Sequence, residues 1–186
     1  MGDLESFFNE HYARLLGIVE RRINPRLRTR KLPEDILQDA FIVVQRRWPK
    51  LNENPDKQNF STLYMIAIDC LREAWRTETR GMRDVRKELP WPDNSYADLG
   101  SRLASPGTTP TQHLAQVDLT QRVRAAMDAL GEGQSDVIHM RYYEELSYCE
   151  IGKVLDISEG AATLRCVRAL EKLQRVFKQL TDESLS

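Results

Sequence analysis

The chain has 186 residues, of which 41% are hydrophobic and 30% charged, and 27 Lys and Arg against 28 Asp and Glu leave a net charge of −1. This composition is typical of a folded globular protein with one or two domains and excludes a wholly disordered chain. It also excludes a globally basic nucleic-acid binder, so any contact with DNA must come from local patches.

Two helices are predicted in the first 50 residues. Apolar residues at steps of three or four predict a helix over residues 4–24, which Pro25 closes. Pro33 opens the next helix, and we expect Pro49 to stop it at about Trp48. The basic cluster between the two helices is either a solvated face or a phosphate contact.

One face of the second helix is acidic and polar. Asp35, Gln38 and Asp39 recur at spacings of three and four, which places them together on that face. The pattern fits a solvated helix surface, and it fits equally a docking surface for a basic partner.

A third helix is predicted from Phe60 to about Arg80, after a polar loop over residues 49–59. Its far end is basic and carries an aromatic residue, with Trp75, Arg76 and Arg80 close together. Such a mixture suits single-stranded nucleic acid, because a base can stack while its phosphate is neutralised. A solvated end of an amphipathic helix explains it equally well.

Residues 81–109 are rich in proline, glycine and turn-forming residues and predict a flexible linker with little regular structure. Some of its residues are apolar enough to dock on another surface: Leu89, Trp91, Tyr96, Leu99 and Leu103. Helix is expected to restart at Thr109-Pro110, to end at Gly131-Glu-Gly133, and to resume over residues 134–143.

The tract Leu146–Leu170 predicts two helices joined by a tight turn. Ser147 and Glu150 have the spacing of a capping box, and Ser158 is placed to cap a longer second helix. Its apolar stripe is Ala162, Cys166, Ala169, Leu173 and Phe177, while Thr163, Leu164, Arg165, Arg168 and Lys172 lie beside or opposite it. This outline is typical of a DNA-reading helix-turn-helix, although an ordinary helical hairpin has the same pattern.

Nothing in the sequence indicates a metal, a cofactor or a membrane anchor. The cysteines, Cys70, Cys149 and Cys166, are far apart and share no ligand spacing with the histidines, so we expect small buried thiols in a reduced compartment. The first residues lack a signal-peptide pattern, and no apolar run approaches the ~20 residues that span a bilayer. We therefore expect a cytoplasmic protein without membrane insertion.

Two separated motifs resemble those of bacterial sigma factors. Glu34-Asp-Ile-Leu-Gln-Asp-Ala-Phe41 is similar to the E-D-L-x-Q-[DE]-x-F signature of sigma region 2, and residues 141–160 resemble region 4. Both motifs in this order, in a chain of this length without a middle domain, resemble the extracytoplasmic-function (ECF) group of sigma-70-like factors. The resemblance implies an all-α fold of two small domains, region 2 over residues 1–80 and region 4 over residues 110–186, joined by the linker 81–109.

The resemblance also implies partners and contacts. The implied partners are core RNA polymerase, promoter DNA and an anti-sigma factor. The parts of the polymerase that would be contacted are the clamp coiled coil and the flap. The resemblance implies no enzymatic activity. The polymerase contacts it implies are Asp35, Gln38 and Asp39. The implied minus-ten contacts are Asn52, Asn54, Asn59, Phe60, Asp69, Trp75, Arg76 and Arg80. The implied minus-thirty-five contacts are Arg141, Ser158, Thr163, Leu164, Arg165, Arg168 and Lys172.

The chain departs from the family pattern at the reading helix and in region 2. Gly160-Ala-Ala-Thr-Leu-Arg165 stands where the family usually has G-T-V-[KR]-S-R, so Thr163 and Leu164 replace a basic and a small polar residue. Asp69 replaces a frequent asparagine and should face a base edge or an arginine. The competing hypothesis is a conventional helix-turn-helix regulator that acts without polymerase, and the linker is expected either to be covered by an anti-sigma factor or to pack the two domains together.

Overall fold

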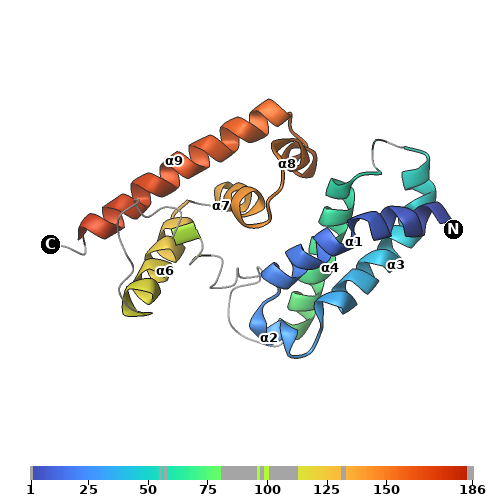
Figure 1. Cartoon of the computed structure of the whole chain (residues 1–186), viewed down its shortest axis with the longest axis horizontal. Helices are drawn as coiled ribbons and strands as arrows, with labels where there is room; N and C mark the ends of the chain where they lie inside the picture. The colour runs from blue at the N-terminus through green and yellow to red at the C-terminus, as the bar shows by residue number, and fades with distance from the viewer. Residues whose placement is uncertain are drawn as a thin grey trace. The chain divides into compact units, whose positions relative to one another are not determined.

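The computed structural model describes residues 2–54, 56, 58–80, 96, 99–100, 113–130 and 133–183. Every regular element in these residues is helical, which confirms the predicted all-α class (Figure 1). No helix among them is long and apolar enough to cross a bilayer. The chain divides into two compact units, residues 1–92 and 93–186, and each is described by itself.

The first unit is a bundle of three long helices and one short one. They are α1 (Gly2–Arg22), α2 (Pro25–Arg28), α3 (Pro33–Asn52) and α4 (Phe60–Thr79). The long helices α1, α3 and α4 lie against one another, and α2 lies in the connection between α1 and α3 (Figure 1). Their apolar stripes are buried in a common core, which includes Leu15, Ile18, Val19, Ile36, Leu37, Val44, Leu63 and Leu71.

Helix α3 does not stop at Pro49, contrary to the expectation from sequence. It continues to Asn52 with Pro49 inside the last turn. Pro49 removes one amide donor, but its carbonyl still accepts the Glu53 N–H at 3.3 Å. Leu51, only 7% exposed, gains core burial by continuing the helix, and this burial offsets the cost of the proline.

The start of α4 lies at Phe60 as predicted, and a local cap that was not predicted fixes it. Asn59 has an extended backbone and its side-chain oxygen accepts the Thr62 N–H at 3.1 Å. This bond satisfies one of the amides that the first turn of a helix leaves without a partner.

The second unit contains α6 (His113–Asp128), α7 (Gln134–Ile138), the π-helical turn η2 (His139–Tyr143), α8 (Tyr148–Leu155) and α9 (Glu159–Glu183). Helix α9 packs against α6, α7 and α8. Its core includes Val123, Ala126, Leu130, Val137, Ile151, Ala162, Cys166 and Leu173.

The single helix expected over residues 134–143 is divided. After Ile138 the hydrogen-bond register widens, and the Glu144 N–H donates to the His139 carbonyl at 2.9 Å. The wider turn keeps His139 and Met140 buried before the chain turns into α8.

Part of the expected linker belongs to the second unit. Tyr96, Leu99 and Gly100 are helical, and the two side chains are buried. Arg124 lies over the Tyr96 ring at 5.2 Å, and an added Cβ at Gly100 would come within 3.0 Å of Leu119. The expectation of irregular structure is therefore wrong for these three residues, because their apolar surface is buried against α6 and its neighbours. Leu89, Trp91, Leu103 and the Thr109 cap lie outside the described residues.

Candidate protein and nucleic-acid interfaces

The acidic face of α3 begins at its first turn. The Asp35 carboxylate accepts the Leu32 N–H at 2.9 Å, so it caps the helix while half-exposed. Gln38 is exposed one turn later. Asp39, also half-exposed, forms an ion pair with Lys31. The structure thus brings the three predicted residues to one face, with one of the two carboxylates already paired to a cation.

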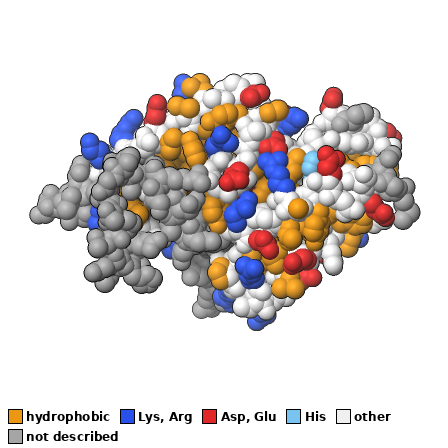
Figure 2. All heavy atoms as spheres, viewed as in Figure 1, with side chains coloured by type: hydrophobic (Ala, Val, Ile, Leu, Met, Phe, Trp, Pro, Cys, Tyr) orange, Lys and Arg blue, Asp and Glu red, His pale blue; other side chains and the backbone are white. Residues whose placement is uncertain are grey.

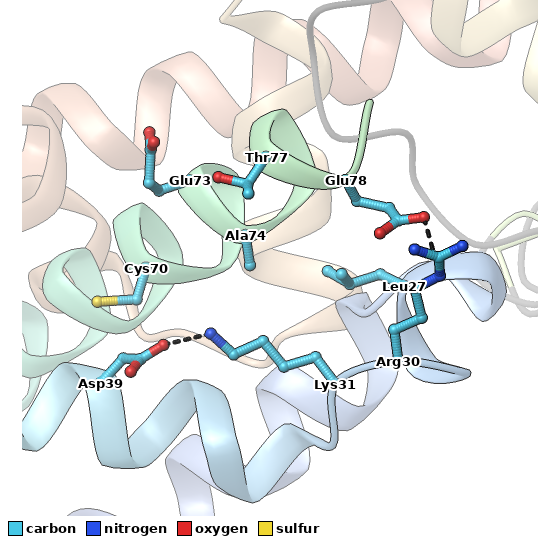
Figure 3. Close-up of a pocket in the computed structure, with 9 residues that line it drawn as sticks. All are labelled: Leu27, Arg30, Lys31, Asp39, Cys70, Glu73, Ala74, Thr77 and Glu78. Atoms are coloured by element: carbon cyan, nitrogen blue, oxygen red, sulfur yellow. Dashed lines mark hydrogen bonds and ion pairs between the residues drawn. The ribbon is translucent and has the colours of Figure 1, made fainter. Parts of the chain in front are cut away.

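An open pocket of about 400 Å³ lies beside this face, between α2, α3 and α4. Lys31 and Asp39 point toward each other across it, and Arg30 and Glu78 meet at its other end at 3.3 Å (Figure 3). The wall contributed by α4 is mixed, with Cys70 and Ala74 beside the polar side chains of Glu73, Thr77 and Glu78 (Figure 3).

The thiol in this pocket is a poor nucleophile. Burial raises the pKa of Cys70 above its ordinary value of 9.0, and the nearby carboxylates of Asp39 and Asp69 raise it further. Lys31 and Arg47 act in the opposite direction but do not reverse the shift. Because the thiolate is the reactive form, Cys70 stays protonated near neutral pH.

Sequence reasoning missed two apolar residues on the acidic face. Leu32 is 57% exposed and Ile42 is 44% exposed. Ile42 follows Gln38 and Asp39 by four and three residues, so it extends the same face. Their outward position was hidden because the pattern alone assigns apolar residues of a helix to the core.

Helix α4 presents a mixed face at its middle and far end. Asp69 is exposed beside Arg72, whose guanidinium lies 3.5 Å from its carboxylate, so Asp69 does face an arginine as expected. Arg76 and Arg80 are exposed further along. Met65, one turn before Asp69, is 37% exposed and was not singled out from the sequence.

The two aromatic residues predicted on this surface lie in the core. Phe60 is 6% exposed and Trp75 is 8% exposed. The Arg14 guanidinium lies 3.8 Å from the centre of the Phe60 ring, and His11 packs against its edge. Neither aromatic ring offers a free face on which a base can stack.

The three asparagines before and at the start of α4 play different parts. Asn52 and Asn54 are exposed at the end of α3. Asn59 is the cap of α4, and its amide also donates to the Asp56 carbonyl. Asn52 and Asn54 are therefore accessible, although the Asn52 side-chain oxygen accepts a Gln58 N–H at 3.3 Å, while Asn59 holds the loop in place.

The predicted helix-turn-helix is formed by α8 and α9. Ser147 and Glu150 make the capping box, with the Glu150 N–H 3.2 Å from the Ser147 hydroxyl and the Ser147 N–H 2.8 Å from the Glu150 carboxylate. The turn places Asp156 in the left-handed region at φ 54°. An added Cβ at Gly152 would lie 2.8 Å from the Ile157 carbonyl, so only glycine lets the turn close this tightly.

Helix α9 turns its apolar stripe inward and a mixed surface outward. The first four stripe residues are buried and Phe177 is half-buried, which confirms the predicted side of the helix. Leu164, Arg165 and Arg168 are exposed. Val167, 42% exposed, joins them and was not predicted.

Four other predicted DNA contacts have internal partners. Ser158 accepts the Ala161 N–H, and the Thr163 hydroxyl donates to the Glu159 carbonyl at 2.9 Å. The Arg141 guanidinium donates to the Leu146 carbonyl at 3.1 Å and lies over the Tyr148 ring. The Lys172 ammonium donates to the Leu130 carbonyl at 3.0 Å and to the Gln134 amide oxygen. These four side chains stabilise the second unit.

Positive and negative side chains are interspersed over the face drawn in Figure 2, in keeping with the net charge of −1. On that face the described part of the surface shows no extended basic field, so contacts depend on local arrangements of apolar and charged side chains.

Comparison with known proteins shows which proteins this chain resembles. Residues 126–175 match the family described as sigma-70, region 4. This segment includes α7, η2, α8 and most of α9. The ECF RNA polymerase sigma factor SigW of Bacillus subtilis is 26% identical over 148 residues, covering 79% of this chain and 76% of SigW. The RNA polymerase sigma factor CarQ of Myxococcus xanthus is 27% identical over 176 residues, covering 95% of this chain and 90% of CarQ.

The region 4 match and these relatives support membership of the ECF group of sigma factors. The ECF RNA polymerase sigma-E factor of Haemophilus influenzae extends the similarity over 96% of this chain at 22% identity, covering 91% of that relative. The similarity therefore includes both units of this sigma factor. The competing hypothesis of a conventional helix-turn-helix regulator finds no support among these relatives.

Proposed function

We propose that this sigma factor binds core RNA polymerase through the acidic face of α3 and directs it to promoters that contact α4 and α9. One observation carries the proposal. The described residues contain five exposed large hydrophobic side chains, and each lies at one of these three faces: Leu32 at the N-cap of α3, Ile42 on α3, Met65 on α4, and Leu164 and Val167 on α9. Exposed apolar side chains beside charged ones are typical of contact surfaces.

The polymerase contact combines charge and apolar burial. Asp35 and Asp39 supply negative charge for the basic clamp coiled coil, and Gln38 supplies an amide between them. Ile42 adds an apolar centre that loses water on binding, which is where most binding energy of such interfaces resides.

The minus-ten contact is assigned to the exposed part of α4 and the end of α3. Arg76 and Arg80 neutralise phosphates, Asp69 meets a base edge, and Met65 offers an apolar surface to an unstacked base. Asn52 and Asn54 add hydrogen-bonding groups. Because Phe60, Asn59 and Trp75 are engaged within the unit, their role is to hold this surface in shape.

The minus-thirty-five contact is assigned to the exposed side of α9 in the major groove. Arg168 and Arg165 carry the positive charge, and Leu164 supplies apolar contact. Ser158, Thr163, Arg141 and Lys172 support the helix from within, through the bonds described above.

The proposal also includes a second polymerase contact, an anti-sigma partner and a cellular location. Region 4 binds the flap of the polymerase, an anti-sigma factor covers the DNA-binding faces, and the protein acts in the cytoplasm where polymerase and promoters meet. No catalytic step is assigned to the chain.

A binding and transcription experiment tests the proposal. Purified core polymerase is titrated with fluorescently labelled wild type and with Gln38→Lys, Ile42→Lys and Gln121→Lys. The first two substitutions place a cation on the α3 face and should weaken binding at least tenfold. Gln121 is exposed on α6, so its variant serves as the matched control and should bind as the wild type does.

The same complexes are then used for run-off transcription on fragmented genomic DNA. New transcripts that share sequence upstream of their starts are expected only when the chain is present. Wild type that fails to bind core, or that binds without giving new starts, would refute the proposed function.

A further inference from the structure

The outward side of the first turns of α9 carries an apolar strip, and the exposed side chains of Arg165 and Arg168 lie beside it. It runs from Gly160 and Ala161 through Leu164 to Val167, with Leu164 49% exposed and Val167 42% exposed. These residues follow one another at spacings of three or four, so they share one side of the helix. Nothing lies within 4 Å of the place where a Cβ on Gly160 would stand.

The hydrogen-bonding groups at this end of the helix are directed elsewhere. The Ser158 hydroxyl accepts the Ala161 N–H at 3.2 Å, and the Thr163 hydroxyl is bonded to the Glu159 carbonyl. The Arg165 guanidinium lies over Gly133, where an added Cβ would come within 2.6 Å of Nη2. Arg165 therefore lies toward α7, at the edge of the reading surface.

An apolar reading surface can recognise only one feature of the bases in the major groove. The C5 methyl of thymine is the apolar group displayed there, whereas the other base edges present donors and acceptors. The first residues of a recognition helix are the ones that meet the base edges. The small residues Gly160 and Ala161 let the helix backbone come close to the DNA, so that Leu164 reaches the floor of the groove.

We propose that Leu164, assisted by Val167, reads thymine methyl groups in the minus-thirty-five element, so that this element carries thymines at the positions facing α9. The inference rests on the proposed function of region 4 and adds the chemical class of base that it selects. Arg168, one turn after Leu164 on the same side, supplies the cation that attracts the flanking phosphates. The partner of these exposed apolar residues is duplex DNA, because the cations Arg165 and Arg168 lie directly beside them.

The test removes single methyl groups from the DNA. A promoter found by run-off transcription is footprinted with the holoenzyme, and each thymine in the protected minus-thirty-five segment is replaced in turn by deoxyuridine. At one or two positions the loss of the methyl should weaken wild-type binding about fourfold, the effect of one methyl that is no longer buried. Leu164→Ala should weaken binding to the thymine duplex similarly and should bind thymine and deoxyuridine duplexes equally.

Gln174→Ala is the matched control, since Gln174 is exposed on the same helix beyond the reading turns. It should keep the wild-type preference for thymine. The inference is overturned if no position responds to deoxyuridine or if Leu164→Ala keeps the same preference. It is also overturned if light scattering shows that Leu164→Ala separates a dimer of the free chain, since the face would then serve self-association. A holoenzyme that starts transcription but gives no minus-thirty-five protection overturns the proposed role of region 4 itself, and the inference with it.

Discussion

The Lys31–Asp39 ion pair leads to a prediction about polymerase binding. Lys31 is paired with the Asp39 carboxylate, which a basic partner needs. Docking of that partner must therefore first displace the Lys31 ammonium. Replacing Lys31 with Met keeps the apolar stem that lines the pocket and frees Asp39. We therefore expect Lys31→Met to bind core polymerase more tightly than the wild type.

The size of the effect follows from the exposure of the pair. The Lys31 side chain is 33% exposed and that of Asp39 is 46% exposed, so water screens the interaction. A pair of this kind contributes at most about 1 kcal/mol. Removing it should therefore lower the Kd for core polymerase by up to about fivefold.

A fluorescence titration of core polymerase at low salt measures this change, with two comparisons. Arg28→Met removes an exposed cation from a neighbouring turn and isolates the general effect of lost positive charge. Lys31→Met in an Asp39→Asn background should show no gain beyond that control. Unchanged or weaker binding by Lys31→Met, or the same gain without the Asp39 carboxylate, would refute the reasoning.

Three further predictions concern the second unit. Gly152→Ala pushes a Cβ against the Ile157 carbonyl and should cost about 1–3 kcal/mol in thermal unfolding, whereas Gly160→Ala, with open space around it, should not destabilise. Asp156→Gly relieves the left-handed backbone and should stabilise by about 0.5–1 kcal/mol, and a lower Tm would contradict this. Burial raises the pKa of the Cys166 thiol above its ordinary value of 9.0, with Arg141 and Arg165 opposing. Because the pKa is higher in the folded state, the free energy of unfolding of the wild type is constant in this respect below pH 9 and falls as the pH rises through the folded-state pKa. Denaturant unfolding should show this alkaline decline for the wild type and not for Cys166→Ala.

Local signals gave the reliable part of the prediction. Ser147 and Ser158 act within three residues of the amides they cap, so these helix starts can be read directly from the sequence. The apolar stripe of α9 is also visible, because its spacing matches the helical period.

Errors arose where the outcome depends on distant packing. Pro49 looks like a helix stop until the burial of Leu51 is known. Trp75 looks like a stacking platform because basic residues are nearby in sequence, and the resemblance implies a DNA contact at Phe60. Both rings are buried, and Arg14 of helix α1 covers the Phe60 ring. Periodicity places apolar residues inside, so it gave no reason to expect Ile42 to be exposed.

The same limit applies to the binding residues. Sequence spacing groups Asp35, Gln38 and Asp39 on one face, as the helix requires. It does not reveal that Asp39 is paired with Lys31 or that Lys172 is bonded to the end of α6, because these partners come from other elements.

The length of α9 has a consequence for folding during synthesis. Helix α9 contacts α7 and α8, which are its near neighbours in the chain, and such local contacts form quickly. Its contact with α6 joins parts that are far apart in the chain. The hydrogen bond from Lys172 to the Leu130 carbonyl, just after α6, joins residues 42 positions apart. At roughly 5–20 residues per second, α6 waits about 2–8 s on the ribosome with Val123 and Met127 uncovered. The contact between α6 and α9 therefore forms only when the middle of α9 emerges.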